Sequence, residues 1–171
     1  MKKTLSISIF SFLLISFAAC KKDSGGSSGY YVKANVGGTQ KNYTSTPLGI
    51  VQNDGGSYSL TIEAGAGGSS LEGLALEINQ TSGAIAAGTY DELSGGSNYA
   101  IASTYNPGSS DVSAIFGAGL KLPTSQPLQI VITSISNSQV SGTFSGEYYD
   151  NSGTGTDSLL VSNGSFNVPI Q

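Results

Sequence analysis

The 171-residue sequence contains no histidine, no arginine and no tryptophan, and it has a single cysteine. The missing histidine removes the commonest general base and metal ligand, and the missing arginine removes the bidentate clamp on phosphates and carboxylates. Most familiar catalytic and metal-binding arrangements are therefore excluded. A lone cysteine also forms no disulfide within the chain, so the stability of the fold must come from packing and hydrogen bonding.

Charged side chains are also scarce, at 11% of the sequence, and hydrophobic residues make up 38%. Small and flexible residues are abundant instead, with 24 glycines, 29 serines and 13 threonines. The low charge argues against a disordered polyelectrolyte. The length predicts one domain, because about 150 residues is close to the commonest domain size.

The first twenty residues have the pattern of an export signal. Lys2 and Lys3 give a positive start, an apolar run follows over residues 5–17, and two small residues precede Cys20. The run is too short for a transmembrane helix, which needs about 20 apolar residues. We therefore predict a signal peptide over residues 1–19 that is removed from the mature protein.

The residues around Cys20, Phe-Ala-Ala-Cys, resemble the lipobox of bacterial lipoproteins. In that motif the cysteine thiol receives a diacylglycerol and becomes the acylated first residue after cleavage. The resemblance implies an anchor in a membrane of the bacterial cell envelope, which we expect to be the outer membrane. The alternative is an ordinary secretory signal with an incidental cysteine.

Residues 20–29 predict a tether, because the nine residues after Cys20 have no apolar side chain to bury and end in serines and glycines. Such a segment reaches at most about 30 Å and averages roughly 15 to 18 Å. Acidic runs beside the cysteine direct some Bacteroidota lipoproteins to the cell surface, and only Asp23 is present here. The choice between the periplasmic and surface faces stays open.

The mature chain is acidic. Residues 20–171 hold 5 lysines and 11 acids, a net charge of −6, and residues 24–171 hold 3 lysines and 10 acids, a net charge of −7. Affinity for nucleic acid depends on basic side chains that neutralise phosphates. Nucleic acid is therefore not an expected partner.

From residue 30 onward, apolar residues alternate with polar ones in short runs separated by turn residues. This pattern predicts an all-β domain over residues 30–171, an antiparallel β-sandwich or flattened barrel of about eight to ten strands. Residues 71–78 also fit a helical stripe, but a short segment containing glycine makes a poor helix. The expected inward side chains include Tyr58, Leu60, Ile62, Leu74, Leu76, Ile78, Leu128, Ile130, Ile132, Val140, Phe144, Tyr148, Phe166, Val168 and Ile170.

Two segments near the end, residues 140–146 (VSGTFSG) and 162–169 (SNGSFNVP), resemble a family of small Bacteroidota lipoproteins of unknown function. Residues 159–170, the last apolar segment, are long enough for one strand bent at Asn163 and Gly164, or for two strands. The resemblance implies an antiparallel β domain that follows a tether, and it implies no catalytic residue.

Ligand-binding residues are expected around the last hairpin, at Tyr148, Tyr149, Asp150 and Asp157. Tyrosine rings beside carboxylates stack on sugars and bond to their hydroxyls. Exposed tyrosines on other strands offer the same chemistry, and the alternation predicts them at Tyr31, Tyr43, Tyr99 and Tyr105. The alternative is that these rings only cover sheet edges.

The acidic residues also suggest two other kinds of site, a calcium-binding loop and a glycosidase pair. The segment from Asp150 to Gly155 imitates the start of a calcium loop, but Val161 stands where a bidentate glutamate is needed. A glycosidase pair needs two carboxyl groups about 5 to 10 Å apart, and Glu147 with other acids supplies candidates by chance alone. Asp157, Ser158 and Leu159 also resemble an acceptor site for O-glycans in exported Bacteroidota proteins.

The sequence therefore predicts a lipid-anchored envelope module that binds a glycan or another envelope protein, without catalysis and without a cofactor. The alternative is a carboxylate-dependent hydrolase acting on envelope or extracellular glycan. No catalytic residue and no metal ligand is assigned.

Overall fold

The computed structural model describes residues 29–94, 98–119, 124–150 and 157–171. These residues are almost entirely β-strand and turn, and the only helical element among them is a short 3-10 turn at Val112–Ala114. None of the described elements is a helix long and apolar enough to cross a membrane. The predicted signal peptide, Cys20 and all but the last residue of the predicted tether lie outside the described residues.

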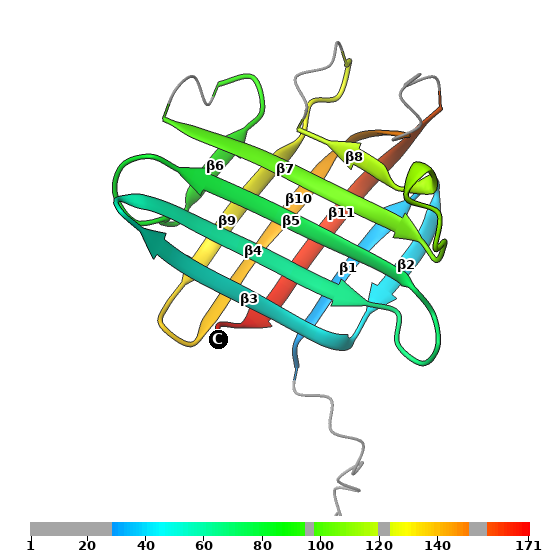
Figure 1. The fold of residues 1–171 in the computed structure, drawn as a ribbon, viewed down its shortest axis with the longest axis horizontal. Helices are drawn as coiled ribbons and strands as arrows, with labels where there is room; N and C mark the ends of the chain where they lie inside the picture. Colours follow the sequence, from blue (N-terminus) through cyan, green and yellow to red (C-terminus); the bar gives the residue numbers. More distant parts are fainter. Residues whose placement is uncertain (1–28, 95–97, 120–123, 151–156) are drawn as a thin grey trace, which may run out of the picture.

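Eleven strands form one sheet (Figure 1). They are β1 (Tyr31–Val36), β2 (Thr39–Tyr43), β3 (Ser45–Asp54), β4 (Ser57–Gly65), β5 (Glu72–Gln80), β6 (Gly88–Asp91), β7 (Tyr99–Pro107), β8 (Phe116–Ala118), β9 (Gln129–Ile135), β10 (Gln139–Asp150) and β11 (Ser158–Pro169). Every pair of strands is antiparallel, and the order is β2-β1-β11-β10-β8-β7-β5-β4-β3, with β9 beside β10 and β6 beside β9.

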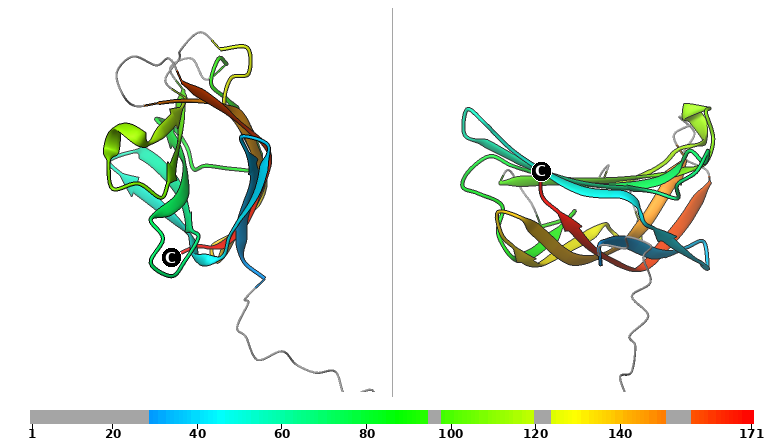
Figure 2. Two further views of the ribbon diagram at one scale, coloured as in Figure 1. Left: turned by 90° about the vertical axis from the view of Figure 1, so that its right-hand side faces the viewer. Right: turned by 90° about the horizontal axis from the view of Figure 1, so that it is seen from below.

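The sheet curls into a flattened, nearly closed barrel (Figure 2). Strands β3, β4, β5 and β7 form one face, and β1, β11, β10 and β9 form the other, with the two sets of strands crossing at a wide angle (Figure 1). An isolated parallel bridge between Gly49 and Ile170 brings the edge strand β3 to the end of the chain. The predicted antiparallel all-β fold is confirmed.

The alternation of side chains agrees with the predicted pattern. Leu74, Leu76 and Ile78 are all buried on β5, so residues 71–78 are a strand and not a helix. The final segment is one strand with a register shift near Asn163, as in the first of the two arrangements considered. The short strands β6 and β8 were not predicted individually.

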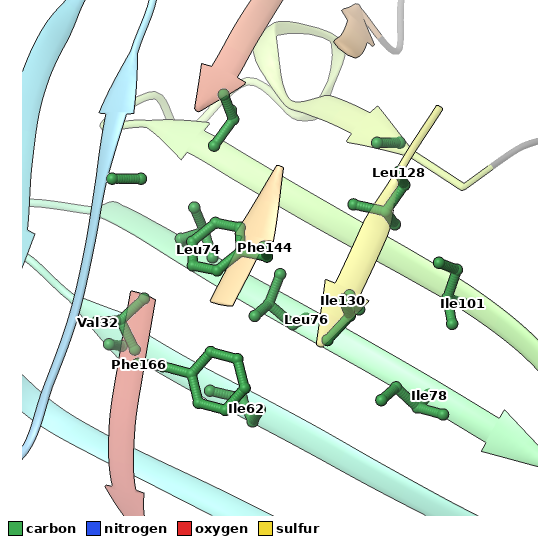
Figure 3. Packing of buried hydrophobic residues seen from close by; sticks show 14 of the residues in the cluster. Val32, Ile62, Leu74, Leu76, Ile78, Ile101, Leu128, Ile130, Phe144 and Phe166 are labelled. Carbon is green, nitrogen blue, oxygen red and sulfur yellow. The ribbon is translucent and has the colours of Figure 1, made fainter. Parts of the chain in front are cut away.

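The core fills the space between the two faces (Figure 3). It includes Val32, Ile62, Leu74, Leu76, Ile78, Ile101, Leu128, Ile130, Phe144 and Phe166, each less than 5% exposed. Burial of such apolar side chains contributes about 1.5 to 3 kcal/mol each. With no disulfide in the chain, this cluster is the main source of stability.

Two glycines make room for two phenylalanine rings inside the barrel. Gly142 on β10 lies opposite Phe166 on β11, and Gly164 on β11 lies opposite Phe144 on β10. The two rings pack with centroids 6.4 Å apart. A Cβ atom at Gly164 would lie 2.7 Å from the Phe144 ring, so no larger residue fits without movement.

Candidate functional site

Tyr148, one of the predicted site residues, points into the core and not toward solvent. Its side chain is fully buried, and its hydroxyl lies 2.5 Å from the Ser103 hydroxyl of β7. Burial raises the pKa of Tyr148, and the phenol stays neutral. The alternation of Val140, Phe144 and Tyr148 had already predicted an inward side chain, and the structure follows that pattern.

The other three predicted residues lie together where β10 and β11 pair. Tyr149 is half-buried on the outer face of β10, and the backbone N–H of Asp150 donates to the carbonyl oxygen of Asp157 over 2.9 Å. Ser158, the predicted glycan acceptor, is exposed and donates to Glu147 Oε1 over 2.9 Å.

The calcium-like segment falls mostly on residues 151–156, which lie outside the described residues. Among the residues that the structure does describe, no three or more acids or cysteines are grouped so as to hold a metal ion. The structure therefore identifies no metal centre from the described side chains.

The expectation of exposed tyrosines is wrong for Tyr43 and Tyr105. Both are buried, at 1% and 5% exposure. The pairing of β2 with β1 puts Tyr43 opposite the inward Val32, and Tyr105 lies on the buried face of β7 with Ile101 and Ser103. Tyr99 also packs against the core, and its hydroxyl accepts from the Asp91 N–H over 3.0 Å. Tyr31 does lie on the outer face, where the Lys33 ammonium is 4.9 Å from its ring centroid.

The hydroxyls of Tyr43 and Tyr105 meet a carboxylate inside one end of the barrel. Both donate to Glu72 Oε1, over 3.3 and 3.2 Å, and the Lys41 ammonium lies 2.9 Å from the same oxygen. Burial raises the pKa of Tyr105 to about 12, with the charge of Glu72 adding to the effect. The cluster ties β2 to β5 and β7, and nothing in the sequence pattern indicated it.

Two carboxylates, Glu92 and Glu147, line a narrow gap where β10 changes its partner from β9 to β8. Glu92 Oε2 accepts from the Leu128 N–H over 2.9 Å, and Glu147 Oε2 accepts from the Thr124 hydroxyl over 2.7 Å. The space between the lining residues has no room for a water molecule.

The pKa of the Glu147 carboxyl group is shifted in the wrong direction for a general acid. Hydrogen bonds from Thr124, Ser158 and Tyr149 lower its pKa, whereas a glycosidase acid needs a raised one. Together with the closed gap, this gives no support to the alternative of a carboxylate-dependent hydrolase at this position.

A larger hollow of about 420 Å3 opens on the outer face of β9, β10 and β11. We call it the outer polar hollow, and it is lined by Gln129, Val131, Thr143, Phe144, Ser145, Asn163, Gly164 and Ser165. Its volume falls within the roughly 300 to 1,000 Å3 of small-ligand sites. None of its lining side chains is charged.

An irregularity in the sheet forms this hollow. The register between β10 and β11 shifts between Phe144 and Gly146, and Asn163 adopts a left-handed backbone conformation with φ of 51°. An extra residue in one strand bends it and increases its local twist. The bend separates the outward side chains of the two strands and leaves the depression between them.

The hollow offers hydroxyl and amide groups around a partly apolar floor. Gln129, Thr143 and Asn163 are exposed at its surface, and Val131 is half-buried. The Ser165 hydroxyl oxygen is buried and has no hydrogen-bond partner among the described residues. A buried polar atom without a partner costs stability unless a ligand or water satisfies it.

The hollow was not predicted from the sequence, although the sequence contains all of its lining residues. The sequence also indicated a bend at Asn163 and Gly164, which lies in the hollow. What the sequence does not show is that β9 and β11 lie on either side of β10, because that pairing joins residues far apart in the chain.

No family model, curated protein or solved structure matches this chain.

Proposed function

We propose that this chain is a lipoprotein of the bacterial outer membrane, anchored through Cys20, whose barrel binds a glycan in the outer polar hollow without transforming it. The anchor follows from the lipobox-like residues before Cys20 and from the polar segment after it. We also propose that the chain belongs with the small Bacteroidota lipoproteins that its last strands resemble. Another envelope protein is the alternative partner.

The observation that carries the proposal is the uncharged polar lining of the hollow, which includes Ser165 with its buried, unpartnered hydroxyl oxygen. Sugars present many hydroxyls together with apolar C–H faces, so they suit a site that combines hydroxyl, amide and apolar groups. Since apolar side chains fill the space between the two faces of the barrel, an outer site is the one that a soluble glycan reaches.

Neighbouring side chains extend this polar surface. Lys33 of β1 lies opposite Ser165, and Tyr31 lies opposite Asn167 of β11. An aromatic ring next to hydroxyl and amide groups provides a surface for stacking on a sugar. The predicted group of Tyr149, Asp150 and Asp157 lies further along the same two strands.

A glycan array on residues 30–171, run with and without calcium, tests the binding site. We expect Thr143→Val to weaken binding roughly five- to tenfold, the loss of one or two hydrogen bonds. Thr61→Val on the outer face of β4 is the matched control and should bind as the wild type does. Loss of binding in Tyr149→Ala alone would move the site to the last hairpin, and absence of any bound glycan would favour a protein partner.

The anchor has its own test. Wild-type protein made in the bacterial host should be labelled by palmitate and should partition into detergent, and Cys20→Ala should abolish both properties. Soluble, unlabelled wild-type protein would contradict lipidation while leaving the glycan site untouched.

A further inference from the structure

One end of the barrel carries an apolar hollow that the proposed glycan site does not use. Five apolar side chains line it, namely Val51, Ala84, Ile85, Ile135 and Ile170, together with residues 136 and 137 of the turn between β9 and β10. Its volume is about 390 Å3, and Val51 is 42% exposed. We call it the tether-end hollow.

The hollow lies at the end of the barrel where the described chain begins. The Asn167 side-chain amide donates to the carbonyl oxygen of Gly29 over 3.0 Å, and the Gln139 side-chain amide donates to Asn167 Oδ1. The Ser136 N–H in turn donates to the Gln139 carbonyl oxygen over 2.9 Å, and Ser136 lines the hollow. Figure 1 shows the start of β1, the turn between β9 and β10 and the C-terminus at the same end.

The length of chain before Gly29 limits how far this end lies from the proposed anchor. Gly29 is the ninth residue after Cys20, and nine residues span at most about 30 Å. A lipid on Cys20 therefore keeps the tether-end hollow close to the bilayer. The opposite end of the barrel is further away by about the length of β9, roughly 20 Å.

The composition of the hollow also fits a lipid surface. None of its lining residues is charged, although the folded part of the chain has a net charge of −7. Exposed Leu71, Leu93, Val112 and Leu160 are not part of its lining. Single exposed apolar residues are normal on protein surfaces. Five apolar side chains gathered around one depression are the feature that indicates a partner.

We propose that this end of the barrel docks on the bilayer and that phospholipid acyl chains occupy the tether-end hollow. The inference rests on the proposed anchoring through Cys20. Docking at this end leaves the outer polar hollow on the side wall of the barrel, where a glycan beside the membrane reaches it. Insertion of apolar side chains stabilises the orientation of the barrel, and the covalent lipid provides most of the affinity.

The absence of tryptophan makes the test direct, because one introduced tryptophan is the only such fluorophore in the chain. The lipidated full chain carrying Val51→Trp is reconstituted into phosphatidylcholine vesicles with brominated acyl chains, which quench tryptophan on contact. We expect roughly twofold quenching, because interfacial side chains enter about 5 to 10 Å. Leu93→Trp is the matched control. The backbone N–H of the neighbouring Glu92 donates to the Leu128 carbonyl oxygen, next to the end of β9 that lies away from the tether-end hollow. The tryptophan emission of this variant should not change.

Flotation of the same vesicles separates the two proposals. Wild type that floats, Cys20→Ala that does not, and quenching at position 51 alone would support both anchoring and docking. Flotation with equal quenching at positions 51 and 93, or with none at either, would overturn docking and leave anchoring intact. Wild type that fails to float would overturn both. If Val51→Trp does not fold, Asn137→Trp in the exposed turn replaces it with the same expectation.

Discussion

The Tyr148 hydroxyl of β10 and the Ser103 hydroxyl of β7 meet inside the barrel, 2.5 Å apart. Ser103 also donates to the Ala75 carbonyl oxygen over 2.8 Å, so its single proton is used there and Tyr148 donates to Ser103. The pair connects β10 and β7 through the core. A buried hydroxyl of this kind is stable only while its partner is present.

The direction of this hydrogen bond predicts an asymmetry between two substitutions. Ser103→Ala leaves the Tyr148 hydroxyl buried without a partner and should lower the free energy of unfolding by about 1 to 3 kcal/mol. Tyr148→Phe removes the donor while Ser103 keeps its bond to Ala75, and should cost only about 1 kcal/mol. Urea denaturation of both variants measures the difference. A larger loss in Tyr148→Phe would contradict the assigned donor.

A second prediction concerns the glycine beneath the Phe144 ring. Gly164→Ala places a methyl group 2.5 Å from the Phe144 carbonyl oxygen and 2.7 Å from the ring, so the core must shift. Overpacking of this kind typically costs about 1 to 3 kcal/mol. Gly29→Ala, which meets nothing within 4 Å, should leave the urea midpoint unchanged. An unchanged midpoint in Gly164→Ala would show that the ring moves aside freely.

Side-chain alternation predicted the inward residues of the long strands β5, β9 and β10, whereas Tyr105 on the equally long β7 was expected outside and is buried. Leu74, Leu76 and Ile78 are an example, and Tyr148 would have been excluded as a ligand-binding residue by the same rule. Tyr43 was misplaced because β2 is short and polar, and its inward face is decided by pairing with β1. Local pattern carries no information about that pairing.

The candidate sites depend even more on long-range pairing. The outer polar hollow needs the register shift between β10 and β11 and the presence of β9 on the other side of β10. The cluster around Glu72 brings together three strands from different parts of the chain. The residue types and the bend near Asn163 can be read from the sequence, and only the fold shows which residues become neighbours.

A third prediction is a pH-dependent contribution from Glu72. Burial alone would raise the pKa of Glu72, but the hydrogen bond and charge of Lys41, with the bonds from Tyr105 and Tyr43, outweigh it and lower the pKa below 4.5. A carboxyl group with a depressed pKa in the folded state stabilises the fold above its unfolded pKa. That stabilisation is lost as the pH falls through the folded-state pKa.

Glu72→Gln provides the comparison, because its amide does not titrate. We expect the wild type to exceed this variant in free energy of unfolding at pH 7, and the difference to shrink progressively below about pH 4.5. Urea denaturation at pH 7, 5 and 3 measures it. A difference that stays constant over this range would show that the charge of Glu72 does not contribute through its contact with Lys41.

The last prediction separates the backbone role of Asn163 from its role in the outer polar hollow. Asn163 has φ of 51°, a conformation that glycine adopts without strain, so Asn163→Gly should keep the bend and leave stability within about 1 kcal/mol of the wild type. The same substitution removes the amide that lines the hollow, and glycan affinity should fall roughly fivefold, as for one lost hydrogen bond. Calorimetry on the glycan identified by the array gives the affinity, and urea denaturation gives the stability. Unchanged affinity in a stable Asn163→Gly protein would remove this amide from the binding site, whereas Asn163→Val, which strains the backbone, should destabilise the fold whether or not a glycan binds.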